Sequence, residues 1–201
     1  MRLRASELVA PEILKKLQSR SNWVGLGLIA HAWGLVFAAM ALFHVFPNPL
    51  TFLLAVMIIG TRQLGLAVLM HDAAHNALFR TINWNNFLSD WLCGYPMMAR
   101  TDAYRRYHLQ HHTRTQQDDD PDLILSKPFP ITRKSLRRKL WRDLSGQTGY
   151  QQRKAQILNA FGSKELGLIG RLQHFWSKLG GAFITHMVIL AACGALFHWS
   201  Y

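Results

Sequence analysis

The sequence contains few cysteines. The two that it has, Cys93 and Cys193, lie far apart and show no metal-binding spacing. A disulfide framework needs several paired cysteines, and iron–sulfur sites need closely spaced ones. The chain is therefore not a disulfide scaffold and has no thiolate-bound cluster.

Acidic residues are also scarce. The chain has 11 Asp and Glu against 23 Lys and Arg, which gives a formal net charge of +12. A positive surplus is typical of proteins that bind nucleic acid or an anionic membrane surface. Half of the 201 residues are hydrophobic, and they gather in long runs. These runs favour the membrane, and we expect no nucleic-acid partner.

Three apolar runs, at about 23–46, 50–70 and 180–199, are long enough to cross a bilayer. At about 1.5 Å per residue, some 20 residues of helix span a hydrocarbon core of about 30 Å. We therefore expect an all-α integral membrane protein with about three transmembrane helices, interfacial helices and a helical loop. Arg62 interrupts the second run, and because a charge within a span is costly, we expect it either to pair inside the protein, which we favour, or to lie near a site.

The organisation follows from the distribution of charge. Residues 1–22 form a basic tail that is either solvated or lies on the membrane surface as a short helix, and 23–201 form one membrane domain in which 71–178 is a largely polar, basic region. The turn at 47–49 carries no charge. Cytoplasmic segments are enriched in Lys and Arg, so we expect the N-terminus and region 71–178 to face the cytoplasm.

Residues 84–95 carry an aromatic and aliphatic stripe at helical spacing. Because the stretch is short and contains Asp90, we expect a helix that lies in the membrane interface. Its members are Trp84, Phe87, Leu88, Trp91, Leu92 and Tyr95.

Two clusters of histidines stand out. His71 and His75 end the second apolar run, and His108, His111 and His112 lie in the polar region. Residues at i, i+3 and i+4 share a helix face, so each cluster presents its imidazoles together. His71 lies about 32 Å along the helix from Leu50, at the cytoplasmic edge of the bilayer. The interfacial stretch can hold the second cluster at the same edge.

Metal ligation explains this convergence better than packing does. Imidazole suits zinc, copper, iron and nickel, but five imidazoles exceed the four ligands of one tetrahedral zinc. Two irons fit better, and such a site could activate O2 against a lipid C–H bond. The remaining histidines are isolated and are expected to be ordinary polar contacts: His31, His44, His174, His186 and His198.

The motifs HDAAHN, YRRYHLQHH and DDDPD resemble the membrane fatty-acid desaturase superfamily in order and spacing. The resemblance implies a non-haem di-iron centre held by His71, His75, His108, His111 and His112. It also implies desaturation of a lipid acyl chain, with O2 as co-substrate and electrons from an external donor such as a ferredoxin or cytochrome b5. The superfamily's third box, H-x2-H-H, has no counterpart here. We therefore expect a fragment truncated before that box, which binds iron poorly and is inactive alone.

Ligating histidines usually donate their second N–H to a carboxylate or carbonyl. Asp72, Asn76 and Asp102 could serve this role, as could the acidic run at 118–122. The basic stretch 133–142 is expected to be an interfacial helix on anionic lipid, or a dock for an acidic electron donor.

Three other functions remain open. HDAAH resembles the metalloprotease motif H-E-x-x-H, but Asp is shorter than Glu and the second cluster would be unexplained. A carotenoid ketolase or hydroxylase, or another lipid hydroxylase, would share both histidine boxes. The third alternative is an inactive, non-enzymatic remnant.

Overall fold

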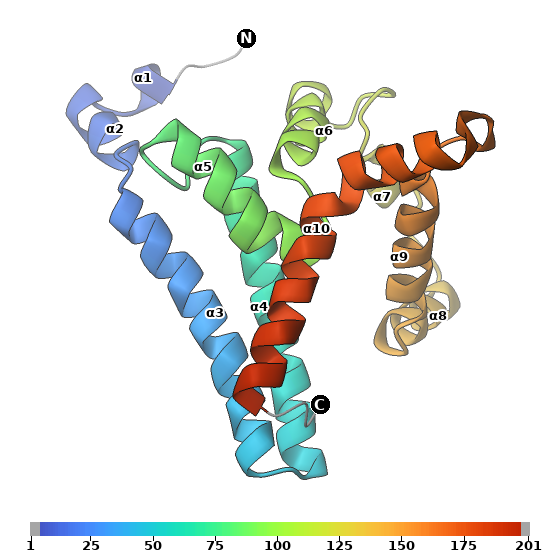
Figure 1. The fold of residues 1–201 in the computed structure, drawn as a ribbon. Helices are drawn as coiled ribbons and strands as arrows, with labels where there is room; N and C mark the ends of the chain where they lie inside the picture. Colours follow the sequence, from blue (N-terminus) through green and yellow to red (C-terminus); the bar gives the residue numbers. More distant parts are fainter. Residues whose placement is uncertain (1–4, 198–201) are drawn as a thin grey trace.

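The computed structural model describes residues 5–197, and all regular structure in that range is helical (Figure 1). The prediction of an all-α fold is confirmed. The α-helices are α1 (Ala5–Leu8), α2 (Pro11–Leu17), α3 (Asn22–Val45), α4 (Pro49–Ala74), α5 (Ile82–Ser89), α6 (Thr101–Arg114), α7 (Leu123–Ser126), α8 (Arg133–Leu144), α9 (Gln147–Ala160) and α10 (Gly167–Phe197).

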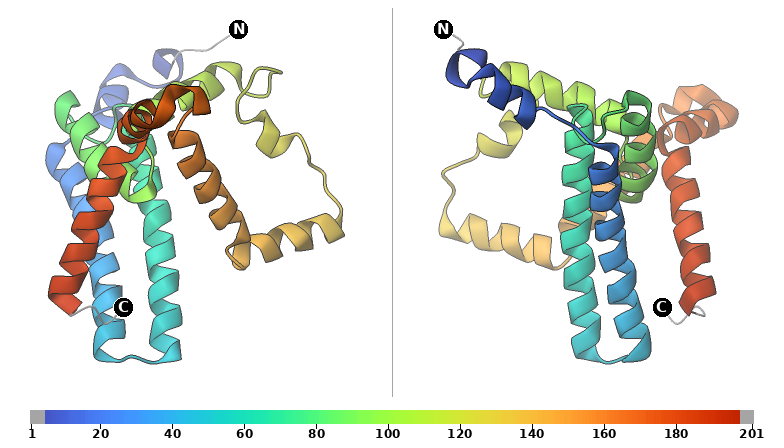
Figure 2. Two further views of the ribbon diagram at one scale, coloured as in Figure 1. Left: turned by 45° about the vertical axis from the view of Figure 1, so that its right-hand side comes forward. Right: turned by 90° about the vertical axis from the view of Figure 1, so that its left-hand side faces the viewer.

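Helices α3 and α4 pack side by side as an antiparallel hairpin (Figures 1 and 2). The turn between them is fixed by Asn48, whose side chain accepts hydrogen bonds from the backbone N–H groups of Leu50 and Thr51. Thr51 completes a capping box, and Pro49 starts the helix without needing a hydrogen-bond partner. The sequence thus ends one span and starts the next within a few residues.

Three segments are long and apolar enough to cross a membrane: Asn22–Val45, Pro49–Ala74 and Gln147–Phe197. The third comprises α9, a 3-10 turn at Lys164–Leu166, and α10. The expected spans at 23–46 and 50–70 are matched by α3 and α4, and α10 covers 180–197 of the third. It starts earlier than expected, at Gly167, and changes direction along its length (Figure 1).

Many large apolar side chains of α3 and α4 point outward, as they would toward lipid. Leu53 and Val56 of α4, for example, are more than half exposed. Arg62 is half-buried, and its buried Nε has no hydrogen-bond partner within the described chain. The expected pairing of Arg62 is therefore not seen among residues 5–197.

The stretch 82–97 is helical throughout but not uniformly α. After α5 it passes through a π-helical turn at Asp90–Gly94 and a 3-10 turn at Tyr95–Met97. The expected aromatic stripe is exposed on α5 itself, at Trp84 and Phe87, and only half-exposed at Trp91 within the π turn. The extra residue of a π turn rotates the next part of the helix about its axis, so the stripe does not stay on one face.

The inward face of α5 is polar. Asn85 and Ser89 are fully buried, and Ser89 shares a 2.8 Å hydrogen bond with Thr101 at the start of α6. Asp90 accepts a 2.7 Å hydrogen bond from the Thr101 backbone N–H. These bonds fix α6 against the end of the 82–97 segment.

The buried core lies where α3, α4 and residues 78–93 meet, next to the histidine-bearing end of α4. Gly25 of α3 permits the closest approach, because a Cβ there would lie 2.5 Å from the Leu78 carbonyl oxygen. The buried apolar members are Ile29, Ala32, Leu66, Leu69, Met70, Ala73, Leu78, Phe79 and Cys93.

Candidate metal centre

The first pair of histidines lies at the end of α4. His71 is in its last turn, and His75 is the residue that caps it. Their ring centroids are 4.8 Å apart. The i, i+4 spacing therefore brings the two imidazoles together, as the sequence predicts.

The second pair lies on α6. His108 is buried and His112 follows one helical turn later, with an Nε2–Nε2 distance of 2.9 Å. The polar character of α6 leaves few apolar side chains to bury, and the face that meets α4 is the one that carries these imidazoles.

The two pairs converge on one point. His108 Nε2 lies 3.0 Å from His75 Nε2, and the rings of His71 and His108 are 4.5 Å apart. One nitrogen from each of the four rings lies within 4.8 Å of the others. These four imidazoles are close enough together that they could hold a metal ion.

The electrostatics of the group favour neutral imidazoles. Burial, and then the neighbouring histidines, lower the pKa of His108 to about 4. Burial also lowers the pKa of His75, as do His71 and His112. A metal binds the neutral form of histidine, so at neutral pH these rings are ready to ligate. The donor set fits zinc, copper or iron and contains no thiolate.

His111, the fifth predicted ligand, lies at the edge of this group. Its ring centroid is 6.0 Å from that of His108 and 5.7 Å from that of His112. Its Nδ1 lies 2.8 Å from Asp120 Oδ1, and this hydrogen bond raises the pKa of His111. The structure thus brings together four of the five histidines and directs Nδ1 of the fifth to a carboxylate.

Asp120 belongs to the acidic run at 118–122. It is buried, and it also accepts hydrogen bonds from the backbone N–H groups of Gln116 and Asp122 at 2.8 and 2.9 Å. One carboxylate therefore shapes the loop after α6 and orients His111, as a carboxylate does for many metal-bound histidines.

The three residues expected to support the ligands lie in different places. Asp72 Oδ1 is 3.3 Å from His71 Nδ1. Asn76 accepts from Arg105 at 3.0 Å, and within residues 5–197 no histidine is among its hydrogen-bond partners. Asp102 forms ion pairs with Arg100 and Arg106 at 3.1 and 3.4 Å. Of the three, Asp72 is the one that contacts a cluster histidine.

Two supporting residues, Arg105 and Asn85, were not expected from the sequence. Arg105 donates to the carbonyl oxygens of Ala73 and Ala74 at 2.9 and 2.8 Å. Asn85 also donates to Ala73, at 2.7 Å. The last carbonyl groups of a helix have no hydrogen-bond donor within that helix. Groups from elsewhere in the chain are therefore expected to donate to the end of α4. The sequence does not show which side chains supply them.

The isolated histidines lie apart from the cluster. His174 and His186 each place Nδ1 near a backbone carbonyl oxygen, at 2.7 and 2.8 Å. His44 packs beside a phenylalanine ring, and His31 is exposed. His198 lies outside the described residues. The positions of the first four agree with the expectation of ordinary contacts.

Comparison with known proteins agrees with this geometry. The model of the fatty acid desaturase family matches residues 47–201, which include both histidine clusters. A stretch of 72 residues is 42% identical to dihydrorhizobitoxine desaturase of Bradyrhizobium elkanii. It covers 35% of this chain and 20% of that protein, so the aligned part spans about a fifth of the relative's length. No solved structure matches. With a family match over most of its length and three segments able to span a membrane, the chain belongs to the fatty acid desaturase family of integral membrane proteins.

Proposed function

We propose that this chain supplies part of the site for the oxidative desaturation of a lipid acyl chain at the cytoplasmic face of a membrane. The observation that carries the proposal is the convergence of His71, His75, His108 and His112 at the end of a membrane-spanning helix. The family is one of non-haem iron oxidoreductases, and an all-imidazole donor set suits iron.

The proposed centre contains two irons, because the four clustered histidines and the adjacent His111 exceed the ligands of one tetrahedral ion. Bound iron would supply the O2 chemistry needed to attack an unactivated C–H bond. Overall, the substrate loses two hydrogens and gains a double bond, while O2 is reduced to two waters. The balance requires two electrons and two protons from an external donor.

The chain's own residues hold this site in place. Burial and the neighbouring histidines lower the pKa of both His75 and His108, which favours the neutral, ligating form at neutral pH. Asp72 lies where it can accept from His71 Nδ1, and Asp120 fixes His111. The ring of Tyr104 stacks on that of His108, with centroids 5.1 Å apart, and so packs against one of the proposed ligands.

The electron donor is proposed to be an acidic protein of the ferredoxin or cytochrome b5 type. Helix α8 is exposed along its length and carries a dense set of cations. A surface of one sign steers a partner of the opposite sign. Its cations are Arg133, Lys134, Arg137, Arg138, Lys139 and Arg142.

Hydroxylation, of a carotenoid or another lipid, is the second candidate, since both reactions begin with attack on a C–H bond. The similarity to a protein named as a desaturase favours the double bond as product. That protein's name also makes dihydrorhizobitoxine a compound to test beside acyl lipids.

Metal binding tests the site first. The purified protein is placed in lipid nanodiscs and titrated anaerobically with Fe²⁺. The same titration is carried out on the His108→Ala and His31→Ala variants. We expect His108→Ala to weaken iron binding at least tenfold and His31→Ala, an exposed histidine on α3, to leave it unchanged. Equal binding by all three proteins would refute the proposed ligands.

Product analysis then tests the reaction. A host that expresses the chain with a donor system is examined by mass spectrometry for new double bonds or hydroxyl groups in lipids, and for conversion of added dihydrorhizobitoxine. A mass loss of two hydrogens that depends on His108 supports desaturation. A His108-dependent gain of one oxygen instead supports the hydroxylase.

A further inference from the structure

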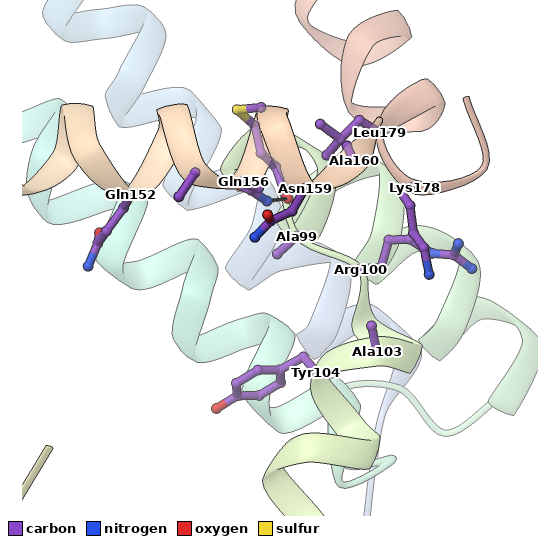
Figure 3. A pocket seen from close by; sticks show the side chains of 12 residues that line it. Ala99, Arg100, Ala103, Tyr104, Gln152, Gln156, Asn159, Ala160, Lys178 and Leu179 are labelled. Carbon is purple, nitrogen blue, oxygen red and sulfur yellow. Dashed lines mark hydrogen bonds between the residues drawn. The ribbon is translucent and has the colours of Figure 1, made fainter. Parts of the chain in front are cut away.

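Helix α6 presents two faces to two different parts of the chain. The face that carries His108 packs against the end of α4, and Tyr104 on this face stacks on His108 and forms part of the wall of the cavity in Figure 3. The neighbouring face carries Tyr107, His111 and Arg114, at i, i+4 and i+7. All three of these side chains contact the loop that follows the helix. The loop is thus folded back along α6.

Tyr107 contacts this loop at two adjacent residues. Its hydroxyl group donates a hydrogen bond to Asp122 Oδ1, and it lies 3.2 Å from the carbonyl oxygen of Pro121. A side chain and a backbone group of the loop therefore both contact one hydroxyl group of the helix. These contacts fix the position of the Asp122 carboxylate relative to α6.

Asp122 lies between Tyr107 and the partner of His111. Its Oδ2 is 3.5 Å from His111 Nδ1, and its backbone N–H donates to Asp120 Oδ1 at 2.9 Å. Asp120 Oδ1 is in turn the nearest acceptor of His111 Nδ1, at 2.8 Å. Tyr107 and His111 therefore bind the same short segment, and Tyr107 holds the end of it that lies next to Asp120.

We propose that Tyr107 is a positioning residue for His111. By holding Asp122 against α6, it keeps Asp120 within reach of His111 Nδ1, so that the ring carries its proton on Nδ1. Nε2 is then the nitrogen that is free to bind a metal ion. The role of His111 as a ligand rests on the proposed function, but the orientation of its ring requires no metal.

Nitrogen NMR of the metal-free protein tests this proposal. The full chain, with isotope-labelled histidine, is placed in lipid nanodiscs at a pH where the imidazoles are neutral. The signals of His111 are assigned with the His111→Gln variant. The wild type is compared with Tyr107→Phe, with Asp122→Ala and with the double variant. Tyr150→Phe, which removes an exposed hydroxyl group of α9, is the matched control.

In the wild type we expect the proton of the neutral His111 ring on Nδ1. Tyr107→Phe should shift the ratio of the two tautomers toward Nε2–H about fivefold, the effect of one hydrogen bond. Asp122→Ala should give the same shift, and the double variant no more than either, because Tyr107 acts through Asp122. The control variant should match the wild type.

Three results would overturn the proposal. The first is a wild-type tautomer ratio in Tyr107→Phe. The second is a further shift when Tyr107→Phe is added to Asp122→Ala. The third is an equal change in the signals of His108 and His112, which would mean a general loosening of α6.

Anaerobic titration with Fe²⁺ separates this proposal from the proposed function. The second iron should bind at least tenfold more weakly to Tyr107→Phe than to the wild type. A wild type that binds one iron, together with tautomers that depend on Tyr107, would count against the two-iron centre alone. Two irons in a wild type whose His111 tautomers are independent of Tyr107 would count against the positioning role alone.

Discussion

Arg105 Nε donates a 2.8 Å hydrogen bond to the carbonyl oxygen of Ala74. This bond ties α6 to the last turn of α4. His75 follows Ala74 directly, and His108 lies one turn beyond Arg105, so the guanidinium links the two helices next to the ligands that each provides. Its NH2 group adds bonds to the carbonyl oxygen of Ala73 and to the side chain of Asn86, at 2.9 and 2.7 Å.

Arg105→Lys should therefore weaken iron binding, although Arg105 is not one of the proposed ligands. Lysine keeps the charge but lacks the planar set of donors. We expect a loss of roughly 2 kcal/mol in unfolding free energy and Fe²⁺ binding at least tenfold weaker. Arg106→Lys is the control, because Arg106 is exposed and pairs with Asp102 at the surface. Unchanged iron affinity in Arg105→Lys would show that the Arg105 hydrogen bonds do not position the ligands.

Asn85→Leu should destabilise the fold. The side chain is fully buried, accepts from the Phe79 backbone N–H at 3.2 Å and donates to the Ala73 carbonyl oxygen. Leucine leaves the Phe79 N–H without its acceptor, at a cost of about 1–3 kcal/mol, and removes one of the donors to the Ala73 carbonyl oxygen, which keeps its bond from Arg105. Asn83→Leu, at an exposed position of the same helix, is the control. Thermal unfolding in detergent measures the difference, and equal melting temperatures would contradict the assignment.

Gly25→Ala should disturb the contact between α3 and the loop after α4. The added methyl group would lie 2.5 Å from the Leu78 carbonyl oxygen and 2.8 Å from the Phe79 ring, so α3 must move. We expect a loss of about 1–3 kcal/mol. Gly27→Ala in the same helix meets nothing within 4 Å and should be neutral. Equal unfolding free energies of Gly25→Ala and Gly27→Ala would refute the close packing at Gly25.

Asp120→Ala should loosen the loop after α6. Without the carboxylate, the backbone N–H groups of Gln116 and Asp122 lose their acceptor, and His111 loses the partner of its Nδ1. Hydrogen exchange of those two amides should accelerate at least tenfold. Asp119→Ala removes an exposed carboxylate that pairs with Arg114, and it should leave these amides unchanged. Slow exchange in both variants would mean that the loop is held by other contacts.

The spans and the histidine pairs were predictable because each depends on short-range geometry. An apolar run such as 50–70 must be helical in a bilayer, because its backbone groups have to form hydrogen bonds within the segment. Two residues at i and i+4 are neighbours on any helix. His71 with His75, and His108 with His112, needed no tertiary information. That the two pairs would meet required only that both lie at the same membrane edge.

The position of His111 could not be predicted in this way. Its direction depends on the rotation of α6 and on the fold of the loop that carries Asp120, both of which are tertiary. The burial of α5 also departs from the usual rule. Its aromatic side chains can face lipid, whereas Asn85 must face protein, where its hydrogen-bond partners lie. The π turn at Asp90–Gly94 lies next to another tertiary contact, the bond from Thr101 to Asp90.

Helix α4 runs without interruption from the capping box at Asn48 to His71, and so joins the turn after α3 to the end that carries the proposed ligands. Its 26 residues correspond to about 39 Å. If α4 spans the bilayer as its length and composition suit, the depth of the imidazoles is set by the length and tilt of this one helix. The depth of the imidazoles therefore depends on the thickness of the bilayer. In a thicker membrane, α4 must stand more upright or the imidazoles move toward the acyl chains, and in a thinner membrane α4 must tilt.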